Sequence, residues 1–334
     1  MHFRRLVLLG TVISSLLLAA PVGAGTTPST YVALGDSYTS GAGLGPFLAG
    51  SNGCDRSPDA YPEVVARALV GTKLAFVACS GATIAQITTQ VAKARAALSE
   101  ASLVTLTAGG NDLSFSKVWI SCVGVVTSPS SNAVEYLPVS GGPSACTSAV
   151  TRAAKLLGAR VNVRTGAVIA PSSVTATTLS TTSPIESRLL TLVQASLGAS
   201  ASGNAGAGAN VLVVAYPMLL AHRTPRVCRI SASPLDLPAG AKLYPVFSSL
   251  ATRELIAINV LLRRETAAVV RTLEATSPRL ALVNTPSFAP IDCRTGASND
   301  LNGLSVALLR SGGSFHPTAV GQTLLATAVL GRIS

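Results

Sequence analysis

Residues 31–38 read YVALGDSY, and this stretch decides the fold. Its first four residues are apolar, which is typical of a strand buried on both faces of a parallel sheet. Gly35 then permits the tight turn that ends the strand. Ser37 is therefore predicted at the carboxyl end of the first strand, where open α/β sheets bind their ligands. The alternative is that this Gly-Asp-Ser turn is only structural.

The rest of the chain alternates between strand and helix patterns. Further aliphatic runs predict buried strands, and the patterns between and after them predict helices. The predicted strands are Lys73–Ala78, Leu103–Thr107, Asn210–Ala215 and Leu280–Asn284, and the predicted helices are Tyr61–Val70, Ile84–Leu98, Thr147–Leu157, Phe247–Ala275 and Thr318–Leu330. This alternation predicts a single α/β domain with right-handed crossovers.

Gly158–Ala209 departs from this rhythm, because it is rich in Ala, Ser, Thr and Gly and nearly free of aromatic residues. Within it, Pro184–Leu197 has one apolar stripe and can form a helix. Gly198–Gly208 has the composition of a flexible linker. We interpret residues 158–209 as a low-complexity insertion at the surface, and a lid over an apolar site is the alternative.

The composition excludes several classes of protein. Of the 334 residues, 48% are apolar and only 12% are charged, which excludes an intrinsically disordered chain. The length excludes a small disulfide-held knot, because it suffices for a large core. The formal net charge is +11, but Lys and Arg are scattered without an aromatic stripe, so we expect no nucleic acid as a partner.

The N-terminus has the pattern of a secretory signal peptide. Met1–Arg5 is basic, Leu6–Ala20 is apolar, and Val22–Ala24 offers small residues at a cleavage site. The apolar run is shorter than the ~20 residues that span a bilayer, although an uncleaved membrane anchor is the alternative. We therefore expect residues 1–24 to be removed and residues 25–334 to form a secreted domain.

The cysteines fit an oxidising compartment. An even number of them in an exported chain predicts disulfides, whose pairing the residues alone leave open. A metal site is the weaker alternative, because no CxxC pair occurs and only His222 and His316 lie beyond the predicted signal. We expect neither a metal nor another cofactor. The six cysteines are Cys54, Cys79, Cys122, Cys146, Cys228 and Cys293.

Further polar blocks lie at the same predicted edge of the sheet. Gly81 is in the turn after the second strand, and Asn111 follows two glycines after the third. An asparagine amide there can donate a hydrogen bond to an oxyanion, although an Asx turn is the alternative. His316 precedes Pro317, which suits the first position of a helix, so His316 is fixed at a helix start.

Together these blocks resemble the SGNH, or GDSL, hydrolase family. The matching blocks are Gly35–Ser37, Gly81, Gly109–Asp112 and His316, in the order of the family. The segment Cys54–Pro62 is similar more specifically to secreted actinobacterial esterases and lipases. The resemblance implies a flavodoxin-like three-layer α/β sandwich with a central five-stranded parallel sheet.

The resemblance also implies the chemistry of the site. Ser37 would be the nucleophile and His316 the general base of an ester hydrolase. The backbone N–H groups of Ser37 and Gly81, with the side chain of Asn111, would bind the oxyanion. Cysteines of these relatives pair sequentially, which implies the disulfides Cys54–Cys79, Cys122–Cys146 and Cys228–Cys293.

One position departs from the family. Many members carry an aspartate three residues before the histidine, and that position is Gly313 in this chain. Some secreted relatives use a backbone carbonyl there, so we expect the Gly313 carbonyl to accept the Nδ1–H of His316. A carboxylate from Asp300 or Asp292 is the alternative.

We therefore expect a secreted, monomeric serine esterase or lipase that acts on fatty acyl esters. A carbohydrate acetylesterase is one alternative, although a single tryptophan, Trp119, and 4% aromatic residues argue against a sugar platform. A non-catalytic lipid-binding protein of the cell envelope is another. Transient contact with a membrane or envelope surface would fit the positive charge. The acyl length and the head group stay open.

Overall fold

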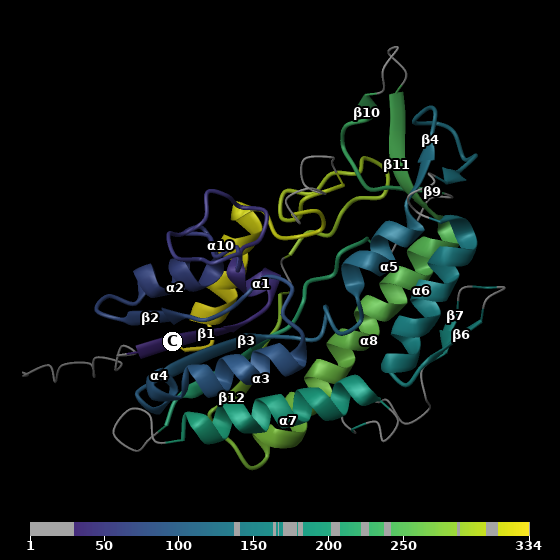
Figure 1. Cartoon of the computed structure of the whole chain (residues 1–334). Coiled ribbons are helices and arrows are strands. Elements are labelled where there is room, and N and C mark those ends of the chain that lie inside the picture. Colours follow the sequence, from purple (N-terminus) through teal and green to yellow (C-terminus); the bar gives the residue numbers. More distant parts are fainter. Residues whose placement is uncertain are drawn as a thin grey trace, which may run out of the picture.

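Figure 1 shows the computed structural model of the chain. The structure describes residues 30–136, 141–162, 165, 167–169, 179, 183–201, 208–221, 227–236, 242–285, 288–304 and 313–333. The predicted signal peptide and His222 lie outside these residues. Within these ranges, every helix is too short or too polar to span a bilayer.

A parallel sheet of five strands forms the centre of the fold, as the resemblance implies (Figure 1). Its order is β12-β8-β3-β1-β2, and each strand pairs in parallel with its neighbour. β1 and β3 lie in the middle and are buried along their whole length, which explains their continuous apolar runs. The strands are β1 (Thr30–Gly35), β2 (Lys73–Phe76), β3 (Leu103–Thr107), β8 (Asn210–Val214) and β12 (Leu280–Val283).

Helices cover both faces of this sheet, which gives the three layers. Figure 1 shows α2 and α10 on one face and α3, α4, α7 and α8 on the other. The predicted helix Ile84–Leu98 is divided in two at Ala94. The helices are α1 (Ser37–Ser40), α2 (Tyr61–Ala68), α3 (Ile84–Lys93), α4 (Arg95–Ser99), α5 (Phe115–Cys122), α6 (Gly142–Leu156), α7 (Pro184–Ala199), α8 (Ser249–Glu274) and α10 (Ala319–Leu330).

The fold also contains a second, antiparallel sheet, which was not predicted; its strand β4 follows α5, and its strand β11 leads directly into α8 (Figure 1). Its order is β10-β11-β4-β5, and β9 pairs with β11. Apart from β11, its strands have only two or three residues, which is too short for a periodic pattern. The strands are β4 (Gly124–Val126), β5 (Glu135–Tyr136), β9 (Val227–Arg229), β10 (Leu235–Asp236) and β11 (Lys242–Ser248).

The segment interpreted as an insertion, 158–209, differs from that expectation in its described part. It contains a short hairpin, β6 (Arg160–Asn162) with β7 (Ala167–Ile169), and helix α7. α7 packs against α3 and α8, so this helix belongs to the layer that covers the sheet and is not a surface excursion. Its side towards the core carries Ile185, Leu189, Leu192 and Val193.

The disulfides join the cysteines in the pairs that the resemblance implies. Cys54–Cys79 fixes the loop after α1 to the turn that follows β2. Cys122–Cys146 fixes the end of α5 to α6, and Cys228–Cys293 fixes β9 to a loop after β12. Each crosslink restricts the unfolded chain and thereby stabilises the folded one.

A buried carboxyl group lies between α7 and α8. The Ser183 hydroxyl donates a hydrogen bond to Glu265 at 2.9 Å, and Glu265 is fully buried. Burial, with a smaller contribution from the nearby Glu186, raises the pKa of Glu265 to about 8, although the hydrogen bond from Ser183 opposes the shift. The folded state therefore favours the protonated form of Glu265 more strongly than the unfolded state does.

We expect Glu265→Gln to stabilise the protein at alkaline pH. A folded pKa above the unfolded value of 4.5 means that the native protein loses stability as the pH rises from 4.5 to about 8. Glutamine removes this loss, which we expect to be worth roughly 1–3 kcal/mol at pH ~8.5 and little at pH ~4.5. Urea unfolding at both pH values measures the difference. The exposed Glu100→Gln is the control, and an equal effect of Glu265→Gln at both pH values would contradict the expectation.

Candidate active site

Ser37 is the first residue of α1, a single helical turn at the carboxyl end of β1. Asp36 caps this turn, because its carboxylate accepts the Tyr38 N–H at 3.0 Å. Gly35 has a φ of +138°, and a Cβ there would come within 2.5 Å of the Thr39 hydroxyl. The turn that presents Ser37 therefore needs glycine at this position.

Two buried glutamines hold this turn from opposite faces of the sheet. Gln90 on α3 forms a pair of hydrogen bonds, each 2.9 Å, with the backbone N–H and carbonyl of Gly35. Gln322 on α10 donates to the Tyr38 carbonyl at 3.1 Å and accepts the Tyr61 N–H at 2.8 Å. Neither glutamine was predicted as part of the site, although a glutamine within the apolar stripe of a helix is a signal of such a role.

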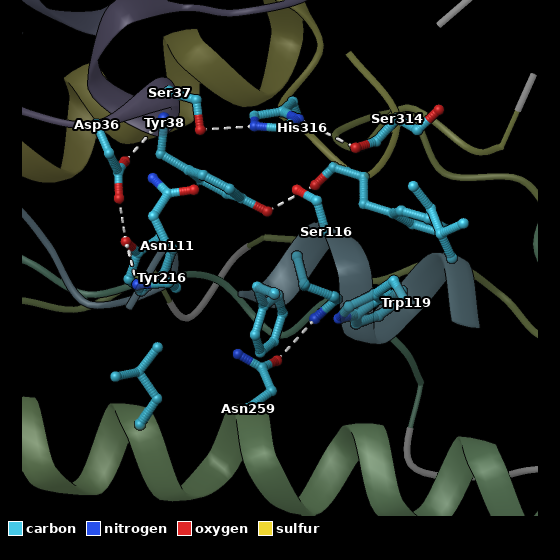
Figure 2. Close-up of a pocket in the computed structure, with 16 residues that line it drawn as sticks. Asp36, Ser37, Tyr38, Asn111, Ser116, Trp119, Tyr216, Asn259, Ser314 and His316 are labelled. Atoms are coloured by element: carbon cyan, nitrogen blue, oxygen red, sulfur yellow. Dashed lines mark hydrogen bonds between the residues drawn. The ribbon is translucent and has the colours of Figure 1, made fainter. Parts of the chain in front are cut away.

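The hydroxyl of Ser37 lies 2.7 Å from Nε2 of His316, as Figure 2 shows. Nδ1 of His316 lies 3.0 Å from the carbonyl oxygen of Ser314. A carbonyl can only accept, so Nδ1 carries the proton and Nε2 is free to accept the hydroxyl proton of Ser37. Burial lowers the pKa of His316 to about 4, so its imidazole is neutral at physiological pH.

The expectation that Gly313 orients His316 is wrong, because the acceptor is the carbonyl of Ser314. The reason is the backbone of Phe315, whose φ of +62° lies in the left-handed region. This turn leaves the Gly313 carbonyl to accept the backbone N–H of His316 at 3.2 Å. Packing on Trp119, with ring centroids 4.5 Å apart, helps to hold Phe315 in this conformation.

The alternative carboxylates are also engaged elsewhere. Asp300 accepts the backbone N–H of Ala289 at 2.6 Å. Asp292 accepts the N–H of Arg294 at 2.9 Å in its own turn. Neither carboxylate therefore orients His316, and the serine and histidine form a pair supported by a backbone carbonyl.

The predicted oxyanion groups lie on two loops that are tied together. The Asn111 amide donates to the Ala82 carbonyl at 3.0 Å, and the Asp112 carboxylate accepts the Ile84 N–H at 2.8 Å. Asn111 lines the cavity next to Ser37, whereas Gly81 lies in the neighbouring loop and does not line it. The φ of Gly81 is +79°, a left-handed conformation that glycine adopts readily because it has no Cβ.

Tyr216, just beyond β8, connects the serine turn to the Asn111 loop. Its hydroxyl donates to the Asp36 carboxylate and accepts the Gly110 N–H at 2.9 Å. Burial raises the pKa of Asp36 to about 7, although the hydrogen bonds from Tyr216 and Tyr38 favour the charged form. Asp36 thus caps the Ser37 turn and ties it to Tyr216, which no sequence motif identified.

An apolar cavity of about 150 Å³ opens beside Ser37 and His316 (Figure 2). α5 supplies much of its wall, and α8 lies across from Ser37 and His316. In the described part of the chain, no His, Cys, Asp and Glu side chains group into a metal site. The apolar side chains that line the cavity include Phe115, Trp119, Ile120, Leu219, Leu262 and Phe315.

A serine paired with a neutral histidine, at the carboxyl edge of a parallel α/β sheet and beside an apolar cavity, is the arrangement of a serine hydrolase. Residues 33–195 match the model of the GDSL-like lipase/acylhydrolase family. The chain is thus similar to these hydrolases over that range, which agrees with the resemblance that its motifs carry.

Known proteins of this kind are similar in sequence and in structure. A lipase from Streptomyces rimosus is 41% identical over 93 residues, which are 28% of this chain and 34% of that protein. The crystal structure of an extracellular lipase from Streptomyces rimosus is 25% identical, covers 92% of this chain and 100% of its own, and has a TM-score of 0.56. The crystal structure of phospholipase A1 from Streptomyces albidoflavus NA297 is 26% identical, covers 92% and 99%, and has a TM-score of 0.58. The match to the first lipase thus spans about a third of its length.

We expect Gln322→Leu to destabilise the protein by roughly 2–4 kcal/mol, because two buried backbone groups lose their partners. These groups are the N–H of Tyr61 and the carbonyl of Tyr38. Urea unfolding measures the effect. Gln194→Leu makes the same chemical change at an exposed position of α7, and it should cost much less. Equal effects of the two substitutions would show that Gln322 does not hold the turn.

Proposed function

We propose that this protein is a secreted serine esterase or lipase that hydrolyses fatty acyl esters. The observation that carries the proposal is the 2.7 Å hydrogen bond between Ser37 and a histidine that burial keeps neutral. The likeness to an extracellular lipase and the three disulfides support export from the cell.

In the first step, the Ser37 oxygen attacks the ester carbonyl while Nε2 of His316 takes the hydroxyl proton. The imidazolium that forms keeps its Nδ1–H bonded to the Ser314 carbonyl, which stabilises the new positive charge. His316 then gives the proton to the leaving alcohol, and the acyl group stays on Ser37. Water then attacks the acyl carbon while His316 takes one of its protons. The bond between the acyl carbon and the Ser37 oxygen breaks, His316 returns the proton to that oxygen, and the acid leaves.

The oxyanion of the tetrahedral intermediate needs donors that are already in place. The N–H groups of Ser37 and Gly81 and the amide of Asn111 are our candidates. The Asn111 amide has two hydrogens, and the bond to the Ala82 carbonyl uses one of them. The other is available to the oxyanion, and one such donor typically lowers the barrier by ~3–4 kcal/mol.

The alternatives receive less support from the site. A carbohydrate acetylesterase would need aromatic platforms open to solvent, but Trp119 is buried in the cluster with Phe247 and Phe315. A non-catalytic lipid-binding protein would not need the hydrogen bond between Ser37 and His316. The described residues of 158–209 do not line the cavity, which gives the lid hypothesis no support.

We expect Ser37→Ala to lower the hydrolysis of p-nitrophenyl acyl esters by at least about 10³-fold, because it removes the nucleophile. The variant should also lose labelling by a fluorophosphonate, which reacts only with an activated serine. Circular dichroism checks that the fold is intact. Ser99→Ala, at an exposed serine of α4, is the matched control and should keep its activity. Full activity of Ser37→Ala would refute the mechanism.

We expect the acid limb of kcat/KM at a pH of about 4, well below the ordinary histidine value of 6.5. Below its pKa, His316 is protonated and cannot accept the proton of Ser37, so activity falls as the pH drops through that value. A pH series with p-nitrophenyl butyrate measures the limb. A limb near pH 7 that disappears in Asp36→Asn would assign it to Asp36 instead, whose pKa is raised to about 7.

A further inference from the structure

Asn259 stands apart from the other polar groups of the cavity. Most of the others belong to the Ser37 turn, to the Asn111 loop and to the segment that ends at His316, while Ser116 and Tyr216 come from α5 and from just beyond β8. Asn259 lies on α8, and Figure 2 shows it across the cavity from Ser37 and His316. Its neighbours among the lining residues, Leu219 and Leu262, are apolar.

The orientation of the Asn259 amide is fixed by one hydrogen bond. Its oxygen accepts the backbone N–H of Leu219 at 3.1 Å, so its nitrogen points another way. Asn259 is only 2% exposed, and Nδ2 finds no acceptor in the part of the chain that the structure describes. A buried donor without a partner costs about 1–3 kcal/mol, which the fold tolerates here.

A second unpaired donor lines the same cavity. Trp119 is 1% exposed, and its indole N–H also finds no acceptor among the described residues. Figure 2 shows Trp119 and Asn259 on the same side of the cavity. Both groups donate hydrogen bonds, and neither free atom can accept one. Any ligand oxygen with a free lone pair satisfies such a donor. A ketone, ester or ether oxygen does so without adding an O–H that would itself need an acceptor in this apolar surrounding.

We propose that this cavity binds an acyl chain with a second oxygen acceptor along its length, and that Asn259, with Trp119, recognises that oxygen. The inference rests on the proposed ester hydrolysis and deepens it, since it names the substrate class. A plain alkyl chain fills the cavity but leaves both donors unpaired. An oxo-acyl chain satisfies at least one of them while its methylene groups contact the aromatic wall. The enzyme therefore prefers esters of oxo acids or alkoxy acids.

The test compares matched esters in one preparation of enzyme. We use p-nitrophenyl heptanoates with a ketone at successive chain positions, each paired with the analogue in which C=CH₂ replaces C=O. Rates of hydroxide-catalysed hydrolysis correct for intrinsic reactivity. At one position at least, we expect the oxo ester to have a kcat/KM about 10-fold above its partner, the effect of one hydrogen bond.

The variants assign this preference to its donors. In Asn259→Leu the ratio should fall to about one, and Trp119→Phe, which keeps the aromatic ring, should lower it if the indole shares the oxygen. Leu262→Met changes the same cavity without a donor and should keep the ratio of the wild type. Each ratio comes from a single preparation, so a partial loss of folded protein cancels.

The outcomes separate this inference from the proposed function. Equal rates for oxo and methylene esters at every position, with fluorophosphonate labelling intact, would overturn the inference and leave ester hydrolysis standing. A preference that survives in Asn259→Leu would also overturn the role of Asn259. If Asn259→Leu does not fold, the ratio in the wild type still decides the substrate class. If the wild-type protein neither hydrolyses any of these esters nor reacts with the fluorophosphonate, the proposed function itself is rejected.

Discussion

The hydrogen bond between Ser37 and His316 joins residues that are 279 positions apart in the chain. Because it tolerates only a few tenths of an ångström, both ends must be held by the backbone around them. Gln90 and Gln322 hold the serine end from α3 and α10. At the histidine end, the Tyr38 hydroxyl donates to the Phe315 carbonyl at 2.6 Å, so the serine turn itself fixes the histidine loop. The central sheet serves mainly as the rigid frame for these contacts.

The electrostatics of the site follow from the carbonyl that replaces a carboxylate. A carboxylate behind the imidazole would raise the pKa of His316, but the Ser314 carbonyl opposes the effect of burial only weakly. The histidine therefore stays neutral over a wide pH range and is a weaker base than in a full triad. In the proposed mechanism, lowering of the barrier therefore depends more on positioning and on the candidate oxyanion donors, which do not depend on the basicity of the imidazole. Two hydrogen bonds, from Asn111 to Ala82 and from Ile84 to Asp112, fix the Asn111 loop to the loop that contains Gly81, which is consistent with a need for accurate positioning.

Sequence reasoning was strongest where local pattern and fold agree. The continuous apolar runs predicted the five strands of the central sheet. Because Ser37 and Asn111 follow two of these runs, the sequence also predicted that both lie at the carboxyl edge of the sheet. It failed where the role or conformation of a residue depends on contacts with residues far away in the sequence. The role of Gln322 depends on backbone groups near residues 38 and 61, and no residue type announces the left-handed φ of Phe315 that selects the Ser314 carbonyl. The composition of α7 suggested a surface segment, yet its few large apolar residues share one side and pack on α3 and α8.

The position of His316 has a consequence for biosynthesis. Ser37 is translated early, whereas His316 is translated only after every strand of the central sheet. α10 follows directly, and it supplies Gln322, which holds the serine turn. A chain that ends before residue 316 thus carries Ser37 without the partner of its hydrogen bond. The order of the elements thus makes the hydrogen bond between Ser37 and His316 depend on nearly the whole chain being made.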